Sequence, residues 1–176
     1  MNKTHILEDP QNGLDELLTT LDILPFKESV YAYFVSICDE NDSQITTIMH
    51  YINLDSHLFK RTMSSATIDS RAIIAALKLA QNINCSILIA HTHPRTSYFP
   101  PECEIYDHGG FSKEDWIFMD KLNCAFNRMF STSTPIYYLV TDGLTYCALE
   151  YAQGQYTNIS VPKLEKMNIL QTRWEV

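Results

Sequence analysis

Long apolar runs are missing from this chain of 176 residues. None approaches the roughly 20 consecutive apolar residues that a membrane-spanning helix needs. The segment 1–10 also has no apolar stretch behind a basic start, so we expect no secretory signal. These two absences predict a cytoplasmic protein that does not insert into a membrane.

Basic clusters are missing as well. The chain has 13 Lys and Arg residues against 21 Asp and Glu residues, which gives a formal net charge of −8 at pH 7. Nucleic-acid binding depends on a basic patch or stripe that neutralises phosphates. We therefore expect that nucleic acid is not a partner.

Paired cysteines are the third absence. The chain has five cysteines, an odd number, and they form no C-x-x-C pair: Cys38, Cys85, Cys103, Cys124 and Cys147. This pattern argues against both a disulfide framework and a structural zinc ribbon. Most of these side chains are expected to be free thiols in the core.

The composition that remains is that of a folded domain, with 45% apolar and 19% charged residues. Periodicity predicts helices over 11–24, 70–82 and 112–130, the second of them capped by Thr67 or Asp69. Apolar and β-branched runs predict strands over 29–38, 45–53, 86–90, 135–140 and 144–151. The segment 54–67 is expected to be an irregular strand and loop that crosses back over the sheet.

This order predicts an α/β fold with a mixed sheet flanked by helices. We expect a main domain over 25–155, an N-terminal helical extension over 1–24 and a C-terminal tail over 156–176. The extension or the tail could bind a partner subunit.

A candidate metal site follows the strand over 86–90. His91 and His93 are separated by one residue, so their side chains point to the same side of the strand. Neutral imidazole is a good zinc ligand, and catalytic zinc needs a third protein ligand. Asp115, in the first turn of the next helix, is the natural third ligand. Two structural histidines are the alternative interpretation.

Two further residues complete a hydrolytic site. Glu28 comes directly before an apolar strand, and we predict that it acts as general base toward water if that strand lies beside the histidine strand. Ser112 begins the helix that carries Asp115 and is predicted to donate a hydrogen bond to a tetrahedral oxyanion.

This constellation resembles the JAMM metalloproteases of the JAB/MPN family. Their signature is an upstream glutamate, H-x-H-P and S-x-x-D, which correspond here to Glu28, His91-Thr92-His93-Pro94 and Ser112-x-x-Asp115. The stretch from Glu28 to Ala148 is also similar to RadC-type domains. The resemblance implies the MPN/JAB fold, a cytidine-deaminase-like α/β/α sandwich.

The segment 95–111 departs from the family pattern, because it lengthens the spacing between Pro94 and Ser112. At the usual spacing Glu104 would be the third ligand, but Ser112 and Asp115 restore the serine and open a helix. The same segment holds Cys103, Asp107 and His108, which leaves open a second metal site or a cysteine nucleophile paired with His108.

The resemblance implies a zinc-dependent protease or isopeptidase, with Zn²⁺ on His91, His93 and Asp115 and with Glu28 and Ser112 as catalytic residues. Its expected substrate is a ubiquitin-like protein, either as a precursor or as a conjugate, as in deubiquitinases. A non-catalytic or RadC-like interaction module on the same fold is the alternative. A protease for the peptide tail of a sulfur-carrier protein is a third interpretation.

Overall fold

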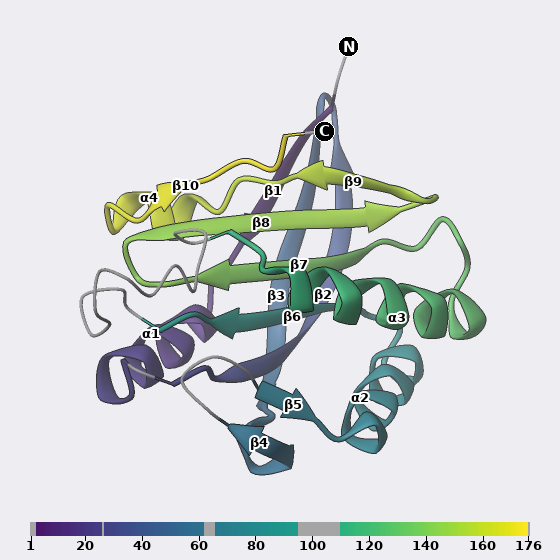
Figure 1. The fold of residues 1–176 in the computed structure, drawn as a ribbon. Helices are drawn as coiled ribbons and strands as arrows, with labels where there is room; N and C mark the ends of the chain where they lie inside the picture. The colour runs from purple at the N-terminus through teal and green to yellow at the C-terminus, as the bar shows by residue number, and fades with distance from the viewer. Residues whose placement is uncertain (1–2, 26, 62–65, 95–109, 176) are drawn as a thin grey trace.

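One large mixed sheet forms the centre of the computed structural model, which describes residues 3–25, 27–61, 66–94 and 110–175, although not the side chains of 57–61 and 66–67 (Figure 1). Its strands lie in the spatial order β1 (Thr4–Glu8), β3 (Ser43–Asn53), β2 (Val30–Glu40), β6 (Ser86–Thr92), β7 (Ile136–Thr141), β8 (Thr145–Ala152) and β10 (Leu170–Gln171). A further strand, β9 (Gln155–Asn158), pairs with β8. The α/β class with a mixed sheet is therefore confirmed.

Helices cover both faces of this sheet. On one face, α2 (Ser70–Asn82) and α3 (Lys113–Met129) pack against a core that includes Ile87 and Ile89 of β6. On the other face, α1 (Gly13–Ile23) and α4 (Pro162–Lys166) pack against a second core that includes Leu88 and Ala90. Because side chains alternate along a strand, the apolar run in β6 supplies both cores at once.

The helix starts follow the local sequence. The carboxylate of Asp69, one of the two predicted caps, accepts a hydrogen bond from the Arg71 amide and begins α2. Ser112 caps α3 as predicted, and Asp115 completes a capping box. The predicted helices over 70–82 and 112–130 and the strand that begins at Ser86 are all confirmed.

The two ends of the chain belong to the same fold as its middle. Strand β1 pairs in parallel with β3, and Leu7 is fully buried. The segment after β9 adds Val161 and Leu164 to the core beneath α1 and α4. Sequence periodicity predicted the helix α1 but none of β1, β9, α4 and β10.

The segment 54–67 differs from its prediction. It contains a 3₁₀ turn (Asp55–His57) and a separate two-stranded antiparallel sheet, β4 (Leu58–Arg61) and β5 (Ala66–Ile68), in place of a strand crossing over the main sheet. Leu54, just before this unit, is buried in the core beneath α2 and α3.

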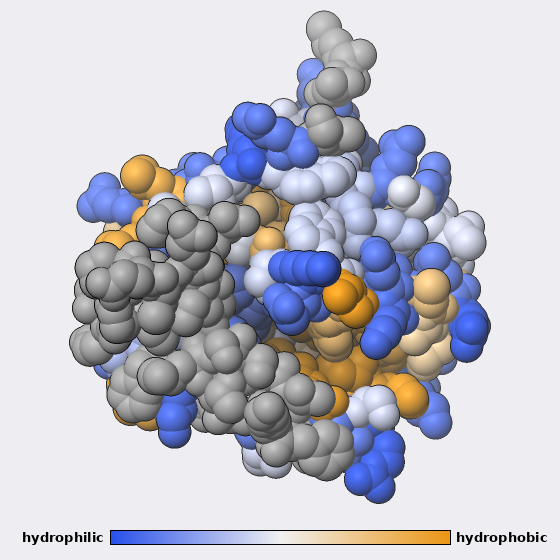
Figure 2. Space-filling model, viewed as in Figure 1, coloured by the Kyte–Doolittle hydropathy of each residue, from blue (hydrophilic) through white to orange (hydrophobic). Residues whose placement is uncertain are grey.

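The surface in Figure 2 is mostly hydrophilic, with apolar side chains gathered between α2 and α3. Ile74 of α2 and Ile117 of α3 are among the exposed apolar residues of these helices. Of the described cysteines only Cys147 is buried, so the expectation of core thiols is wrong for Cys38 and Cys124, which are exposed. No helix within the described ranges combines the length and the apolar character that crossing a bilayer requires.

Candidate metal centre

The candidate site lies where β6 ends. His91 is the sixth residue of this strand and His93 follows its end, so their side chains point to the face covered by α3. Hydrogen bonds to the neighbouring chain segment on each side fix the backbone at this point. The Thr92 amide donates to the Ser29 carbonyl (3.0 Å), and the His93 amide donates to the Thr141 carbonyl at the end of β7 (2.9 Å).

Asp115 reaches the histidines from the first turn of α3. The Ser112 amide donates to Asp115 Oδ2 (2.6 Å), and the Asp115 amide donates to Ser112 Oγ (3.2 Å). These reciprocal bonds fix the carboxylate rotamer as well as the start of the helix. The helix N-terminus also favours a negative charge at this point.

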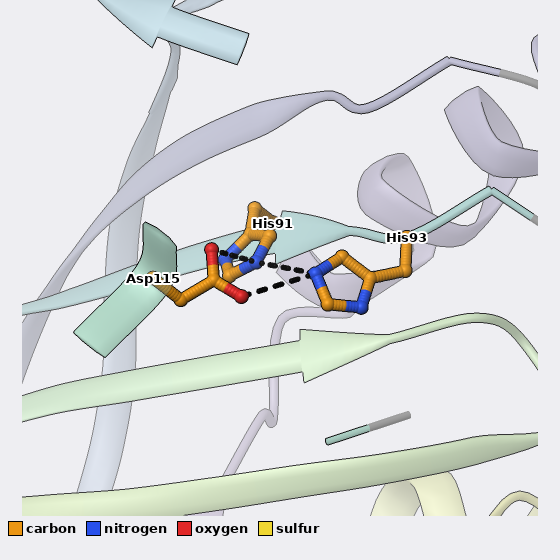
Figure 3. Close-up of side chains that lie close together, drawn as sticks. All are labelled: His91, His93 and Asp115. Atoms are coloured by element: carbon orange, nitrogen blue, oxygen red, sulfur yellow. Dashed lines mark hydrogen bonds and ion pairs between the residues drawn. The ribbon is translucent and has the colours of Figure 1, made fainter. Parts of the chain in front are cut away.

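The three side chains converge, as Figure 3 shows. The Nε2 atoms of His91 and His93 lie 3.2 Å apart. Asp115 Oδ1 lies 3.1 Å from His91 Nε2, and Oδ2 lies 3.2 Å from His93 Nε2. One ligand atom of each residue thus falls within 4.8 Å of the other two, and no other group of this kind occurs among the described residues.

This spacing suits a metal ion. Ligand atoms at 2.0–2.1 Å from a tetrahedral zinc ion are roughly 3.3 Å apart. The two imidazole Nε2 atoms are 3.2 Å apart, and each lies 3.1–3.2 Å from one of the two oxygens of Asp115. Two imidazoles and one carboxylate are also a ligand set of catalytic zinc sites. The cluster can therefore hold a metal ion, and the identity of that metal stays a prediction.

The three groups perturb one another in the metal-free protein. Burial lowers the pKa of His91, but the carboxylates of Asp115 and Glu28 outweigh it and raise this pKa overall. Burial also lowers the pKa of His93, and here the neighbouring His91 adds to the effect. Burial would raise the pKa of Asp115, yet the two imidazoles hold it well below its usual range. An ionised Asp115 beside a neutral His93 is ready to bind a cation.

Glu28 lies two residues before β2, and β2 is the neighbour of the histidine strand, as the prediction required. Strand β2 pairs antiparallel with β6, and Val30 is the partner of His91. The pairing extends to Ser29, whose amide donates to Thr92 Oγ1 (2.9 Å). Glu28 is 8% exposed, and its charge acts on the pKa of His91. Its role as general base remains a prediction.

The alternatives within 95–109 lie outside the described residues. Glu104, Cys103, Asp107 and His108 all belong to that segment, as does most of the lengthened segment 95–111. The neighbouring Phe111 is described and buried, with its ring centroid 6.1 Å from that of His91. Sequence reasoning assigned no role to this residue, because its contact depends on the path of the chain before α3.

Comparisons with protein-family models and with curated proteins found no match.

Proposed function

We propose that the protein is a zinc-dependent hydrolase of amide bonds, of the JAMM type, on an MPN/JAB-like fold. One observation carries the proposal: His91, His93 and Asp115 bring their ligand atoms within 4.8 Å of one another. They do so at the end of a central strand and the start of a helix, where the resemblance in sequence predicted them. The arrangement of helices on both faces of the sheet is compatible with the α/β/α sandwich that this family implies.

The chain supplies the rest of the chemistry. Zinc, when bound, acts as a Lewis acid that acidifies water and polarises the carbonyl of an amide. Glu28 takes a proton from the attacking water and passes it to the leaving amine. Ser112 Oγ accepts a hydrogen bond from the Asp115 amide, so its own proton can be donated to the oxyanion that forms during attack.

The proposed substrate is the C-terminal tail of a ubiquitin-like protein, joined by a peptide bond in a precursor or by an isopeptide bond to lysine in a conjugate. The burial of Glu28 and His93 supports this hydrolytic role, because charges that stabilise a transition state act more strongly where water is excluded. A non-catalytic role would not require three metal ligands to converge.

Two measurements test the proposal. Protein purified without chelators should contain about one zinc per chain, and less than roughly half an equivalent would favour the non-catalytic module. Glu28→Gln should retain the metal and lose at least about 100-fold in cleavage of a tail-extended or lysine-linked ubiquitin-like protein.

Glu40→Gln is the matched control for Glu28→Gln. Glu28 lies two residues before β2, whereas Glu40 is the last residue of that strand and is exposed. We expect it to cleave like the unchanged protein. Full zinc-dependent cleavage by Glu28→Gln would contradict the assignment of the base.

A further inference from the structure

A cavity of about 540 Å³ lies beside the candidate metal centre. Its walls come from Phe111 and Trp116 at the start of α3, from Cys147 of β8 and from the C-terminal residues Thr172 to Glu175. The volume is within the range of about 300–1,000 Å³ that is typical of sites for small molecules and side chains. We call it the aromatic cavity.

The aromatic cavity shares a wall with the metal centre. The ring of Phe111 lies 6.1 Å from that of His91 and 5.7 Å from that of Trp116, measured between centroids. Asp115 and Trp116 are also consecutive in α3. A substrate chain whose cleaved bond lies at the histidines and Asp115 therefore has the aromatic cavity next to it.

The C-terminal residues Thr172 to Glu175 form the far wall of the aromatic cavity, and hydrogen bonds hold this wall in place. Asn158 Nδ2 donates to the Trp174 carbonyl (2.9 Å), and the Trp174 amide donates to Asn158 Oδ1 (3.0 Å). The Thr172 amide donates to the Tyr146 carbonyl (2.7 Å). Trp174 also packs on Trp116, with 5.5 Å between ring centroids, and on Tyr156. The cavity is thus already formed without a ligand, which reduces the entropic cost of binding.

The lining favours an uncharged, bulky occupant. Among the described residues that line it, Phe111, Trp116 and Trp174 contribute three aromatic rings. Burial raises the pKa of the Cys147 thiol to about 11, so this wall is neutral at physiological pH. The charged residues, Arg173 and Glu175, are exposed and opposite in sign. Such an apolar interior with a polar rim suits a large apolar side chain.

We propose that the aromatic cavity is a specificity pocket that holds a large apolar side chain, aromatic or aliphatic, of a substrate residue close to the cleaved bond. The role of this pocket in cleavage rests on the proposed hydrolytic function. Binding of the side chain itself requires no metal, so the two can be tested separately.

The tryptophans provide the test. The chain has two, Trp116 and Trp174, and both line the aromatic cavity. Zinc-free protein is titrated with N-acetyl-phenylalaninamide, N-acetyl-leucinamide, N-acetyl-lysinamide and N-acetyl-glycinamide while tryptophan emission is recorded. We expect a saturable change with the phenylalanine and leucine amides, at affinities at least tenfold higher than for the glycine amide. Equal binding of the glycine amide, or preference for the lysine amide, would overturn the proposal.

Variants of the far wall locate the binding. Trp174→Ala should weaken binding of the phenylalanine amide at least tenfold, and Trp174→Phe should largely keep it. Trp116 remains as the fluorescent reporter in both. Binding that is unchanged in a folded Trp174→Ala protein would overturn the assignment to this cavity, and the comparison of amides in the unchanged protein decides the question if that variant does not fold.

Zinc uptake and cleavage separate this inference from the proposed function. Trp174→Ala should bind zinc like the unchanged protein, yet lose its preference for substrates with a large apolar residue near the cleaved bond. If the unchanged protein binds the phenylalanine amide but neither takes up zinc nor cleaves, the hydrolase proposal and the cavity's role in specificity both fail. If it cleaves but shows no preference for apolar residues, only the specificity pocket fails.

Discussion

Val30 and His91 are direct partners in the antiparallel pairing of β2 and β6. Residues two apart in an extended chain share a face, so this pairing places the segment that begins at Glu28 along the same side as His91 and His93. The residue predicted as general base and two candidate metal ligands thereby come from one pair of neighbouring chain segments. Two of the three candidate ligands, His91 and His93, are thus positioned by the central sheet.

The first prediction concerns zinc and stability. Free zinc at about 100 times its dissociation constant should raise the free energy of unfolding by about 2.7 kcal/mol, because it binds only the folded protein. His93→Ala should abolish this gain, as measured by thermal unfolding of each variant with and without zinc. His50→Ala alters an exposed histidine of β3 and is the control. An equal gain in His93→Ala would show that zinc binds elsewhere.

The second prediction separates the two roles of Ser112. At a helix N-cap, alanine in place of serine costs about 0.5–2 kcal/mol, whereas glycine costs only a few tenths. Both changes remove the hydroxyl, and loss of one oxyanion donor lowers kcat by roughly 10²–10³. Ser112→Gly should therefore be nearly as stable as the unchanged protein but poorly active, and Ser112→Thr should retain both properties. Full activity of Ser112→Gly in a steady-state cleavage assay would restrict Ser112 to capping.

The third prediction concerns the reactivity of Cys147. Only the thiolate is alkylated, and a thiol with a pKa of about 11 is roughly 0.1% ionised at pH 8. Burial blocks access as well. In a timed reaction with iodoacetamide followed by mass spectrometry, Cys147 should react at least about 100-fold more slowly than the exposed Cys38 and Cys124.

The pH dependence of this reaction has a definite sign. The pKa of Cys147 is raised from the model-compound value of 9.0 to about 11, so its alkylation should keep accelerating as the pH rises toward 11. A rate at Cys147 that levels off near pH 9, while circular dichroism shows an intact fold, would contradict the buried position.

The fourth prediction tests whether the C-terminal segment is part of the core. Leu164 is 1% exposed, so Leu164→Ala should destabilise the protein by about 2–5 kcal/mol in urea unfolding. Leu170→Ala is the matched control, because that leucine is 68% exposed and its loss should cost less than about 0.5 kcal/mol. Similar midpoints for the two variants would argue that the segment after β9 contributes little to folding.

The elements predicted from sequence are those whose signal is local. The helix over Ser70–Asn82 has an apolar stripe and a capping aspartate, and β6 is a continuous apolar run before His91. Ser112 and Asp115 mark the start of α3 by a capping pattern that needs no tertiary information. The separation of His91 and His93 by one residue is a local pattern as well. The three candidate ligands could therefore be named before their geometry was known.

The elements missed are those that distant contacts stabilise. Strand β1 has five residues and gains its hydrogen bonds from β3, far along the chain. Helix α4 also has five residues, too few for periodicity to show, and it is fixed by the burial of Leu164. The aromatic cavity was missed because Trp174 and Trp116 meet only after the sheet has formed.

The capping box of α3 also bears on how the chain can vary in length. Asp115 is positioned by the Ser112 amide and by the first turn of its own helix, and not by a count of residues from Pro94. The segment 95–109 can therefore lengthen or shorten without shifting the carboxylate, provided that α3 still begins at Ser112. The position of the Asp115 carboxylate therefore does not depend on the length of the connection between Pro94 and Ser112.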